Sequence, residues 1–356
     1  MPGFAAALAV SGGGDSIALM HLFADWARRE SISRPAVLIV DHGLRRESYD
    51  EAALVAQWAK NAGFAAAVMR WRGRKPQSNI EDEARAARYR LLGEWCKARM
   101  TPYLFAAHTR EDQAETFLLR LGRGSGVDGL SGMRAAGPLP VPGFAPVRLL
   151  RPLLDMGRTE LRAYLQGRGE HWLEDPMNAD CRFARVRIRQ ALPGLEAAGV
   201  SVQRIAQAAG HLARAREALE AATEEFFERH TQLGADFALM DGGALAHNSR
   251  EIGLRVLSAV LMRVAGAPYR PRFERLEALF DAISVEPFTA RTLLGCRIAK
   301  APKGRAVFGG ATLLIVREPA RRSRLNGANA GKLMRNADTV SDRPGNPPHK
   351  GRIRPL

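Results

Sequence analysis

Apolar and polar positions follow two different periods in the first 121 residues. Short aliphatic runs such as Ala36–Val40 predict buried strands, and longer segments such as Ile80–Met100, with apolar residues every three or four positions, predict amphipathic helices. The predicted strands are Phe4–Val10, Ala36–Val40, Phe64–Trp71 and Tyr103–Ala107, and the predicted helices are Asp15–Glu30, Ser48–Asn61, Ile80–Met100 and Asp112–Leu121. Strands that alternate with helices predict an α/β fold, a doubly wound parallel sheet covered by helices on both faces.

The second half of the chain has a different pattern. A Gly- and Pro-rich break covers Gly122–Pro152. Beyond it, helices are predicted over Arg158–Gln166, Val202–Arg229, Ile252–Val264 and Arg272–Ile283, and strands over Thr292–Ala299 and Ala306–Val316. We therefore expect a sheet domain over residues 1–192, then a helical region that ends in a small C-terminal α+β element over residues 193–318.

The charge of the chain indicates a class of partner. Its 356 residues carry 53 Lys and Arg against 37 Asp and Glu, a net charge of +16. Residues 320–356 hold nine basic and two acidic residues with little apolar material, so we expect a basic, disordered tail over residues 319–356. The positive excess favours a nucleic acid partner, although a basic protein from an Arg-rich proteome is the plainer alternative.

Cysteine usage and the first residues favour a cytoplasmic protein. Cys96, Cys181 and Cys296 lie far apart and form no CxxC pair, zinc spacing or disulfide framework. The first residues lack the basic region of a secretory signal, and no apolar stretch has the length that a membrane span needs.

The strongest candidate for chemistry is a Gly-rich loop between the first predicted strand and helix. It consists of Ser11, Gly12, Gly13, Gly14, Asp15 and Ser16. Glycines let backbone N–H groups face an anion, and the helix that follows points its positive end at the same place. The loop is neither a Walker A sequence nor GxGxxG. We expect it to bind phosphate, with Asp15 as a Mg²⁺ ligand, and a purely structural turn is the alternative.

Charged residues follow two further strands and begin the longest predicted helix of the sheet domain. Asp41 lies at a strand end, where open α/β sheets bind ligands, although it also suits a simple turn. Asp112 and Glu115 share a helical face that suits an ammonium group or Mg²⁺, unless they only complement the helix dipole. Arg85 and Arg88 also share a helical face, where a salt-bridged surface is the plainer interpretation.

Further arginines are candidates for contacts with RNA phosphates. Two lie in the Gly-rich stretch 118–133, and three alternate along the sequence near aromatic residues. These candidates are Arg120, Arg123, Arg185, Arg187 and Arg189. A solvated basic face is the alternative interpretation of the alternating set.

Taken in order, these motifs resemble the tRNA(Ile)-lysidine synthetases, a family of PP-loop ATP pyrophosphatases. The segments that carry the resemblance are SGGGDS, VDHGLR, EDEARAARYR, EDQAETFLLRLGRGSGVDGLSGM, RPLL and WLEDPMNADCRFARVRIR. They lie between Ala9 and Arg189, about half of the chain. The chain departs from the family's usual residues at Thr109, where a second His is typical, and at Glu111, where an Asp is typical.

The resemblance implies a fold like that of the adenine nucleotide α-hydrolases and an ATP-dependent ligase. In such an enzyme the wobble cytidine of the CAU-anticodon isoleucine tRNA is adenylated on its 2-carbonyl oxygen, and the ε-amine of L-lysine then displaces AMP to form lysidine. It implies that residues 11–16 hold ATP with Mg²⁺ and that Asp41, Asp112 and Glu115 hold lysine or the ion. One of these carboxylates is then the general base, and Arg85 and Arg88 neutralise charge on the phosphoryl group. The helical and C-terminal region 193–318 then binds the tRNA, and a homodimer is a further implication.

Two alternatives stay open from the residues. A tRNA thiolase on the same scaffold generally needs a reactive cysteine pair or an Fe–S cluster, and the three cysteines form no such motif. A non-catalytic, ATP-sensing RNA-binding protein explains the charge and the glycine loop but not the carboxylates that follow separate strands. Lysine-dependent release of AMP distinguishes the ligase from both.

Overall fold

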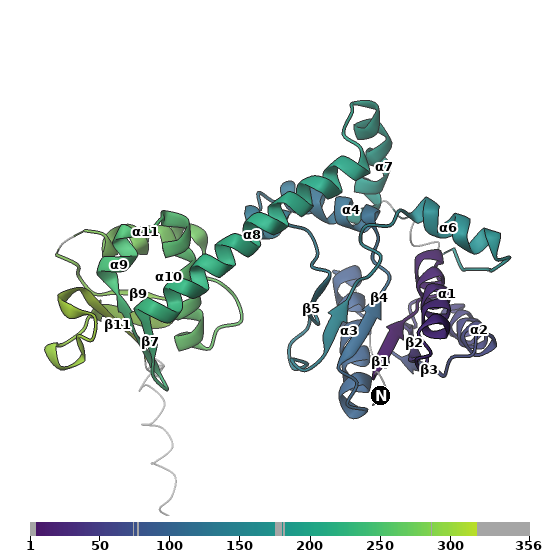
Figure 1. Cartoon of the computed structure of the whole chain (residues 1–356), viewed down its shortest axis with the longest axis horizontal. Coiled ribbons are helices and arrows are strands. Elements are labelled where there is room, and N and C mark those ends of the chain that lie inside the picture. Colours follow the sequence, from purple (N-terminus) through teal and green to yellow (C-terminus); the bar gives the residue numbers. More distant parts are fainter. Residues whose placement is uncertain are drawn as a thin grey trace, which may run out of the picture. The chain divides into compact units, whose positions relative to one another are not determined.

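The chain folds as two compact units, Met1–Ala222 and Thr223–Leu356. A computed structural model describes residues 5–73, 75–76, 78–174, 180, 182–285 and 287–318. The long helix α8, Val202–His230, crosses from one unit to the other (Figure 1). The predicted tail 319–356 and Cys181 lie outside the described residues. The division of the chain at residues 192 and 193 stays a prediction.

A six-stranded, mostly parallel sheet forms the centre of the first unit. Its strand order is β3-β2-β1-β4-β6-β5, and only β5 pairs in the antiparallel direction. The strands are β1 (Ala6–Ala9), β2 (Ala36–Asp41), β3 (Ala66–Arg70), β4 (Tyr103–Ala106), β5 (Ala136–Pro138) and β6 (Arg148–Leu150). The predicted doubly wound α/β fold is confirmed. β5 and β6 fall inside the predicted break, because three residues are too few to show a period of two.

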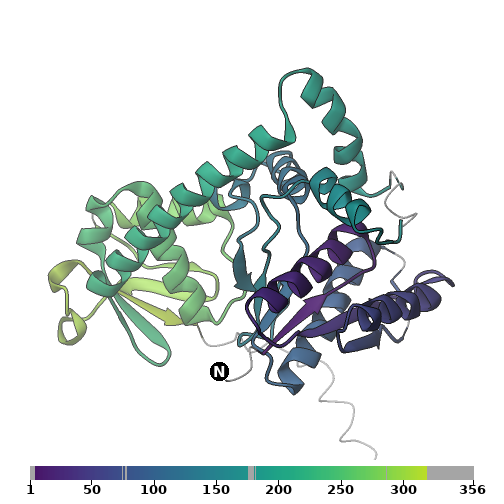
Figure 2. The ribbon, with the colours of Figure 1, turned by 45° about the vertical axis from the view of Figure 1, so that its right-hand side comes forward.

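Helices cover both faces of this sheet. The helices of this unit, besides the start of α8, are α1 (Gly14–Arg29), α2 (Ser48–Asn61), α3 (Ile80–Ala98), α4 (Arg110–Leu121), α5 (Val127–Leu130), α6 (Arg158–Gly167) and α7 (Ala184–Ala197). Leu8 of β1 packs in one core cluster with α1, α2 and α6, whereas the neighbouring Ala7 packs with α3 on the other face. Figure 2 shows α1 running alongside β1, both in purple. The glycine loop between them therefore lies at one end of the sheet, where β1 stops.

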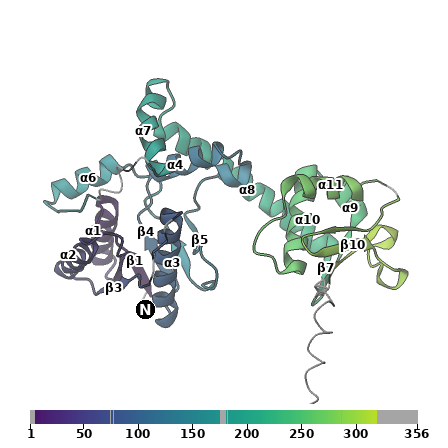
Figure 3. The same cartoon turned by 180° about the vertical axis from the view of Figure 1, so that it is seen from behind.

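The second unit holds the predicted small α+β element. Its described part has a five-stranded antiparallel sheet, in the order β7-β8-β11-β10-β9, against which α10 and α11 pack (Figure 3). The elements are β7 (Thr231–Leu233), β8 (Phe237–Asp241), α9 (Gly242–His247), α10 (Arg250–Ala265), α11 (Phe273–Ile283), β9 (Arg291–Leu293), β10 (Cys296–Lys300) and β11 (Thr312–Arg317). No helix in the described part of the chain is long and apolar enough to cross a membrane.

Two strand predictions in this unit are wrong in detail. The segment Thr292–Ala299 is a hairpin of two strands, because Leu294 and Gly295 adopt positive φ angles of 54° and 73° and reverse the chain. The strand predicted from Ala306 begins only at Thr312, because short 3₁₀ turns occupy the preceding residues.

Candidate active site

The glycine loop is tightly enclosed at one position. Gly12 has a φ of 94°, and a Cβ there would lie 2.7 Å from Cγ2 of Val55 and 2.9 Å from Cδ1 of Leu173. A Cβ at Gly13 or Gly14 would meet no atom closer than 3.5 Å. Gly12 thus allows both an otherwise strained backbone and the close approach of two distant segments.

The Ser16 hydroxyl fixes the shape of the loop. Its Oγ accepts the N–H groups of Ser11 and Gly12 at 3.1 and 3.2 Å and donates to the carbonyl oxygen of Gly13 at 2.8 Å. The N–H groups of Gly14 and Asp15 belong to the first turn of α1, where no intrahelical acceptor exists. Those N–H groups and the positive end of the helix dipole can therefore bind an anion such as a phosphate.

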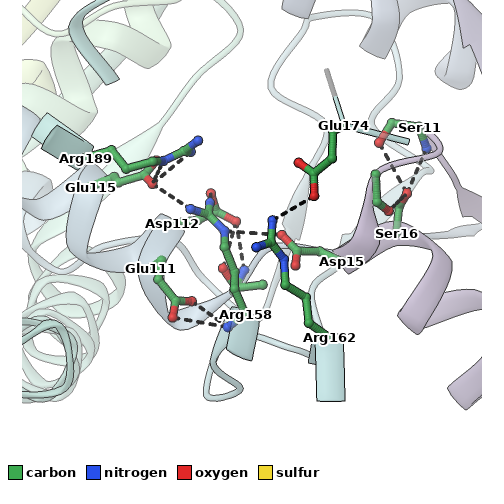
Figure 4. Close-up of polar contacts among 12 residues, drawn as sticks. Ser11, Asp15, Ser16, Glu111, Asp112, Glu115, Arg158, Arg162, Glu174 and Arg189 are labelled. Carbon is green, nitrogen blue, oxygen red and sulfur yellow. Dashed lines mark hydrogen bonds and ion pairs between the residues drawn. The ribbon is translucent and has the colours of Figure 1, made fainter. Parts of the chain in front are cut away.

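Three predicted carboxylates converge on the guanidinium of Arg158, which was not among the predicted site residues (Figure 4). Arg158, the first residue of α6, places Nε 3.3 Å from Oδ2 of Asp15, Nη2 2.6 Å from Oδ1 of Asp112 and Nη1 3.0 Å from Oε1 of Glu115. Asp15 of the glycine loop is thereby joined to the two acids of α4. The only sequence signal for Arg158 was its position shortly after the RPLL segment.

Glu115 is the most deeply buried of these acids. Its side chain has no solvent exposure, and Nη2 of Arg189 also lies 3.0 Å from its Oε1. Its Oε2 has no hydrogen-bond partner among the described residues. Leaving a buried acceptor unpaired costs about 1–3 kcal/mol, so this oxygen is suited to accept a donor from a bound ligand.

Burial and charge within this cluster shift the pKa values of its members in different directions. Burial raises the pKa of Asp15 above its ordinary value, and Arg158 only partly offsets this. Burial alone would raise the pKa of Asp112 too, but Arg158 and the N–H of Thr109 hold it below its ordinary value. Burial alone would lower the pKa of Arg158, whereas the carboxylates of Asp112, Glu115 and Asp15 raise it. Arg158 is therefore charged at neutral pH, and Asp112 is an ionised carboxylate.

The two residues that depart from the family pattern support this cluster. Thr109 precedes α4 and donates its N–H and its hydroxyl to Oδ2 of Asp112, at 2.9 and 3.2 Å. Glu111 accepts the backbone N–H of Arg158 with both oxygens, at 3.1 and 3.0 Å. Thr109 thus orients Asp112, and Glu111 fixes the first turn of α6 against α4.

Asp41 has different surroundings from the other predicted carboxylates. Its side chain is 1% exposed, and it accepts the N–H of Gly43 at 2.9 Å, the hydroxyl of Ser48 at 2.7 Å and Nε of Arg70 at 2.8 Å. Burial alone would raise the pKa of Asp41, but these donors hold it below its ordinary value. None of the three donors belongs to the Arg158 cluster.

Arg85, Arg88 and Arg151 place positive charge around His108. The guanidinium carbons of Arg85 and Arg88 lie 5.0 and 5.6 Å from the ring of Tyr89, and neither arginine forms an ion pair within the described ranges. Burial lowers the pKa of His108 to about 3; the carboxylate of Asp112 opposes this shift, and the charges of Arg151, Arg85 and Arg88 add to it. Positive charge beside a neutral histidine favours the binding of an anion.

The predicted RNA-binding arginines differ in their contacts. Nη1 of Arg120 donates to the carbonyl oxygens of Gly129 and Gly132 at 2.7 and 3.1 Å, so this side chain holds the Gly-rich stretch in place. Arg123 is exposed.

The three alternating arginines lie on the helix α7, which the sequence pattern did not predict. Arg185 and Arg189 are four residues apart on one helical face, where Arg185 lies 3.7 Å from Glu81 and Arg189 contacts Glu115. Nη1 of Arg187 instead donates to the carbonyl oxygen of Arg182 at 2.9 Å. The helix therefore places Arg187 apart from Arg185 and Arg189, although their alternation in the sequence suggested that the three form one patch.

The two described cysteines are buried. Burial raises the pKa of Cys96 to about 11, and it also raises the pKa of Cys296. A nucleophilic cysteine needs a lowered pKa, so these two thiols pack in the cores of their units instead.

Comparisons with known proteins show which family this chain is similar to. The PP-loop domain family matches residues 3–195. The tRNA(Ile)-lysidine synthase of Wolbachia pipientis wMel is 38% identical over 318 residues, which is 88% of this chain and 71% of the relative. That of Ruegeria pomeroyi is 40% identical over 82% of this chain and 68% of the relative, and that of Rhodopseudomonas palustris is 39% identical over 89% and 92%. Among solved structures, the U34-tRNA thiolase NcsA from Methanococcus maripaludis with its [4Fe-4S] cluster gives a TM-score of 0.48 at 16% identity, over 60% of this chain and 70% of that one.

Proposed function

This chain belongs to the tRNA(Ile)-lysidine synthase family, and from that premise we propose that it ligates L-lysine to the wobble cytidine of a CAU-anticodon isoleucine tRNA. The reaction uses ATP and proceeds through an adenylated base. The observation that carries the proposal is the convergence of Asp15, Asp112 and Glu115 beside the glycine loop. A site that joins an anion-binding loop to buried carboxylates suits a reaction between ATP and an amine.

The glycine loop binds the pyrophosphate part of ATP in this proposal. The N–H groups of the first turn of α1 face the phosphates, and Gly12, Gly13 and Gly14 let the backbone approach them. Asp15 fits the role of a Mg²⁺ ligand, because this ion is usually held by one or two carboxylates together with substrate phosphates. Bound there, Mg²⁺ would neutralise charge on the phosphates and on the departing pyrophosphate.

Asp112 and Glu115 hold the amine of lysine. A carboxylate attracts the ammonium form and accepts its proton, which the amine must lose before it attacks C2 of the cytidine. The unpartnered Oε2 of Glu115 supplies one acceptor that is already buried and fixed. Asp41 is a further candidate for binding lysine or the ion, although three donors of the protein already contact it.

Arg85 and Arg88 stabilise negative charge on the α-phosphoryl group during adenylation and when AMP leaves. Their support is that both guanidinium groups lie against Tyr89 without an acidic partner in the described chain. A positive charge that is fixed before the reaction needs no rearrangement when charge develops.

The tRNA binds to basic surfaces of both units. Arg120, Arg123, Arg185, Arg187 and Arg189 are the candidates beside the site, and the cytidine must leave its stack to reach it. The net charge of +16 predicts affinity that falls steeply with salt. A cytoplasmic location and a homodimer are part of the proposal.

Transfer of radiolabelled L-lysine to purified tRNA tests this function. The assay contains ATP, Mg²⁺ and either an isoleucine tRNA with a CAU anticodon or a methionine tRNA as the control. Label on the isoleucine tRNA alone, with AMP and pyrophosphate released, is the expected result. Pyrophosphate release without label would contradict the lysine assignment and favour sulfur transfer, and neither signal from folded protein would favour the binding-protein alternative.

A further inference from the structure

Arg158 lies between the carboxylates to which the proposed function assigns Mg²⁺ and lysine. We infer that Arg158 is a positioning residue: its guanidinium holds the carboxylates of Asp15, Asp112 and Glu115 at one point, so that the ATP site and the lysine site stay joined. The inference rests on the proposed function.

The geometry supports this role through three separate contacts. Each guanidinium nitrogen of Arg158 contacts a different carboxylate, at distances between 2.6 and 3.3 Å. A guanidinium has its donors in a fixed planar fork, so it sets the directions of its partners as well as their charges. A lysine at this position would supply one point charge on a flexible chain and would not fix three directions.

Without Arg158, these carboxylates would repel one another. Asp112 and Glu111 already raise the pKa of Asp15 through their negative charges. Glu115 is fully buried, and its other partner, Arg189, contacts the same oxygen that Arg158 contacts. Loss of Arg158 would therefore leave the buried charge of Glu115 with only one of its two described arginine partners, Arg189. It would also release Asp15 and Asp112 from their common partner.

The position of Arg158 is itself fixed by the backbone. Glu111, next to Asp112, accepts its N–H, and Glu160 accepts the preceding N–H of Gly157 at 2.6 Å. The side chain is 21% exposed, so it lies between the buried acids and solvent. An external guanidinium ion can therefore enter the space that a truncated side chain leaves.

Arg162 provides a matched control. It lies one turn later on α6, pairs with Glu174 at 3.2 Å, and its side chain is 51% exposed. Because surface pairs of this kind contribute little, Arg162→Ala should retain wild-type lysine transfer within about twofold.

The test compares Arg158→Ala, Arg158→Lys and Arg162→Ala in the lysine-transfer assay, with and without about 20 mM guanidinium chloride. We expect Arg158→Ala to lose about 100-fold in kcat/KM for lysine, because small displacements of reacting groups have effects of that size. Guanidinium should restore about tenfold of this loss and have no such effect on the wild type or on Arg162→Ala. The kcat/KM of Arg158→Lys for lysine should lie between the values of Arg158→Ala and the wild type, with a raised KM for lysine.

Two results would overturn the inference. One is an Arg158→Ala protein that transfers lysine within threefold of Arg162→Ala; the other is a folded, impaired Arg158→Ala protein on which guanidinium has no effect. If Arg158→Ala does not fold, Arg158→Lys and Arg158→Gln replace it, and equal activities of those two would contradict the role. Failure of the wild type to transfer lysine would instead contradict the proposed function.

Discussion

Asp41 ends strand β2 and Asp112 lies in the helix after strand β4 of the same sheet, and both have lowered pKa values, yet their partners come from different distances along the chain. Asp41 contacts Gly43 in the turn that follows it, Ser48 at the start of α2, and Arg70 at the end of the neighbouring strand β3. Asp112 shares Arg158 with Asp15, a residue far from both in the sequence. A lowered pKa alone therefore does not identify a catalytic carboxylate, because a structural turn lowers it in the same direction.

The largest expected effect comes from the buried member of the cluster. Glu115→Gln removes the charge that Arg158 and Arg189 both contact, and we expect kcat/KM for lysine to fall about 1000-fold. The lysine-transfer assay measures this, with circular dichroism to verify folding. Glu220→Gln, a change in a surface carboxylate that pairs with Arg134, is the control. Equal activities of the two variants would remove Glu115 from the site.

Substitution of Gly12 tests whether the glycine loop depends on the close approach of the segments that hold Val55 and Leu173. Gly12→Ala places a Cβ at positive φ and within 3 Å of Val55 and Leu173, so we expect the free energy of unfolding to fall by about 2–4 kcal/mol. Denaturant unfolding measures the change. Gly14→Ala meets no atom closer than 3.5 Å and should change stability by less than about 1 kcal/mol. Similar losses in both variants would show that the enclosure of Gly12 is unimportant.

His108 tests the positive side of the site through pH. Its pKa is about 3 in the folded protein, against about 6.5 in the unfolded chain. Between these values only the unfolded chain binds the proton, so the stability that His108 contributes is present above pH 6.5 and is lost as the pH falls. From pH 7.5 to 5.5 the wild type should lose about 1.4 kcal/mol more than His108→Gln. Parallel stability curves for the two proteins would contradict the burial of a neutral His108.

The smallest expected effect concerns tRNA binding. Arg123→Ala removes one exposed positive charge, so we expect tRNA affinity to fall about two- to fivefold and the slope of log affinity against log salt to decrease by about one. Binding measured at several salt concentrations gives both values. Arg120→Ala should also loosen the stretch that Arg120 holds, which would appear as increased hydrogen exchange near Gly129 and Gly132. An unchanged salt slope for Arg123→Ala would exclude a phosphate contact.

The sequence predicts local features of this protein well. The mostly parallel, doubly wound sheet follows from alternating strands and helices, and the glycine loop stands between β1 and α1 as predicted. Asp112 and Glu115 also lie together on one face of α4, because their spacing matches the helical period.

What the sequence could not predict depends on contacts between distant residues. Arg158 lies more than forty residues after Asp112, and no local pattern distinguishes it from the other arginines of the chain. The alternation of Arg185, Arg187 and Arg189 resembled a single patch, but packing of α7 against α4 directs Arg189 to Glu115. The short strands β5 and β6 take their conformation from pairing at the edge of the sheet.

The most direct test of the account compares Asp112→Ala and Asp41→Asn in one lysine-transfer assay with the CAU-anticodon isoleucine tRNA. Asp112→Ala should lose lysine transfer by about 100-fold or more, because it removes a carboxylate from the convergent cluster. Asp41→Asn should lose less lysine transfer than Asp112→Ala and should also lose stability, because Gly43, Ser48 and Arg70 already contact its carboxylate. Wild-type lysine transfer by Asp112→Ala would contradict the central claim that this cluster binds the lysine.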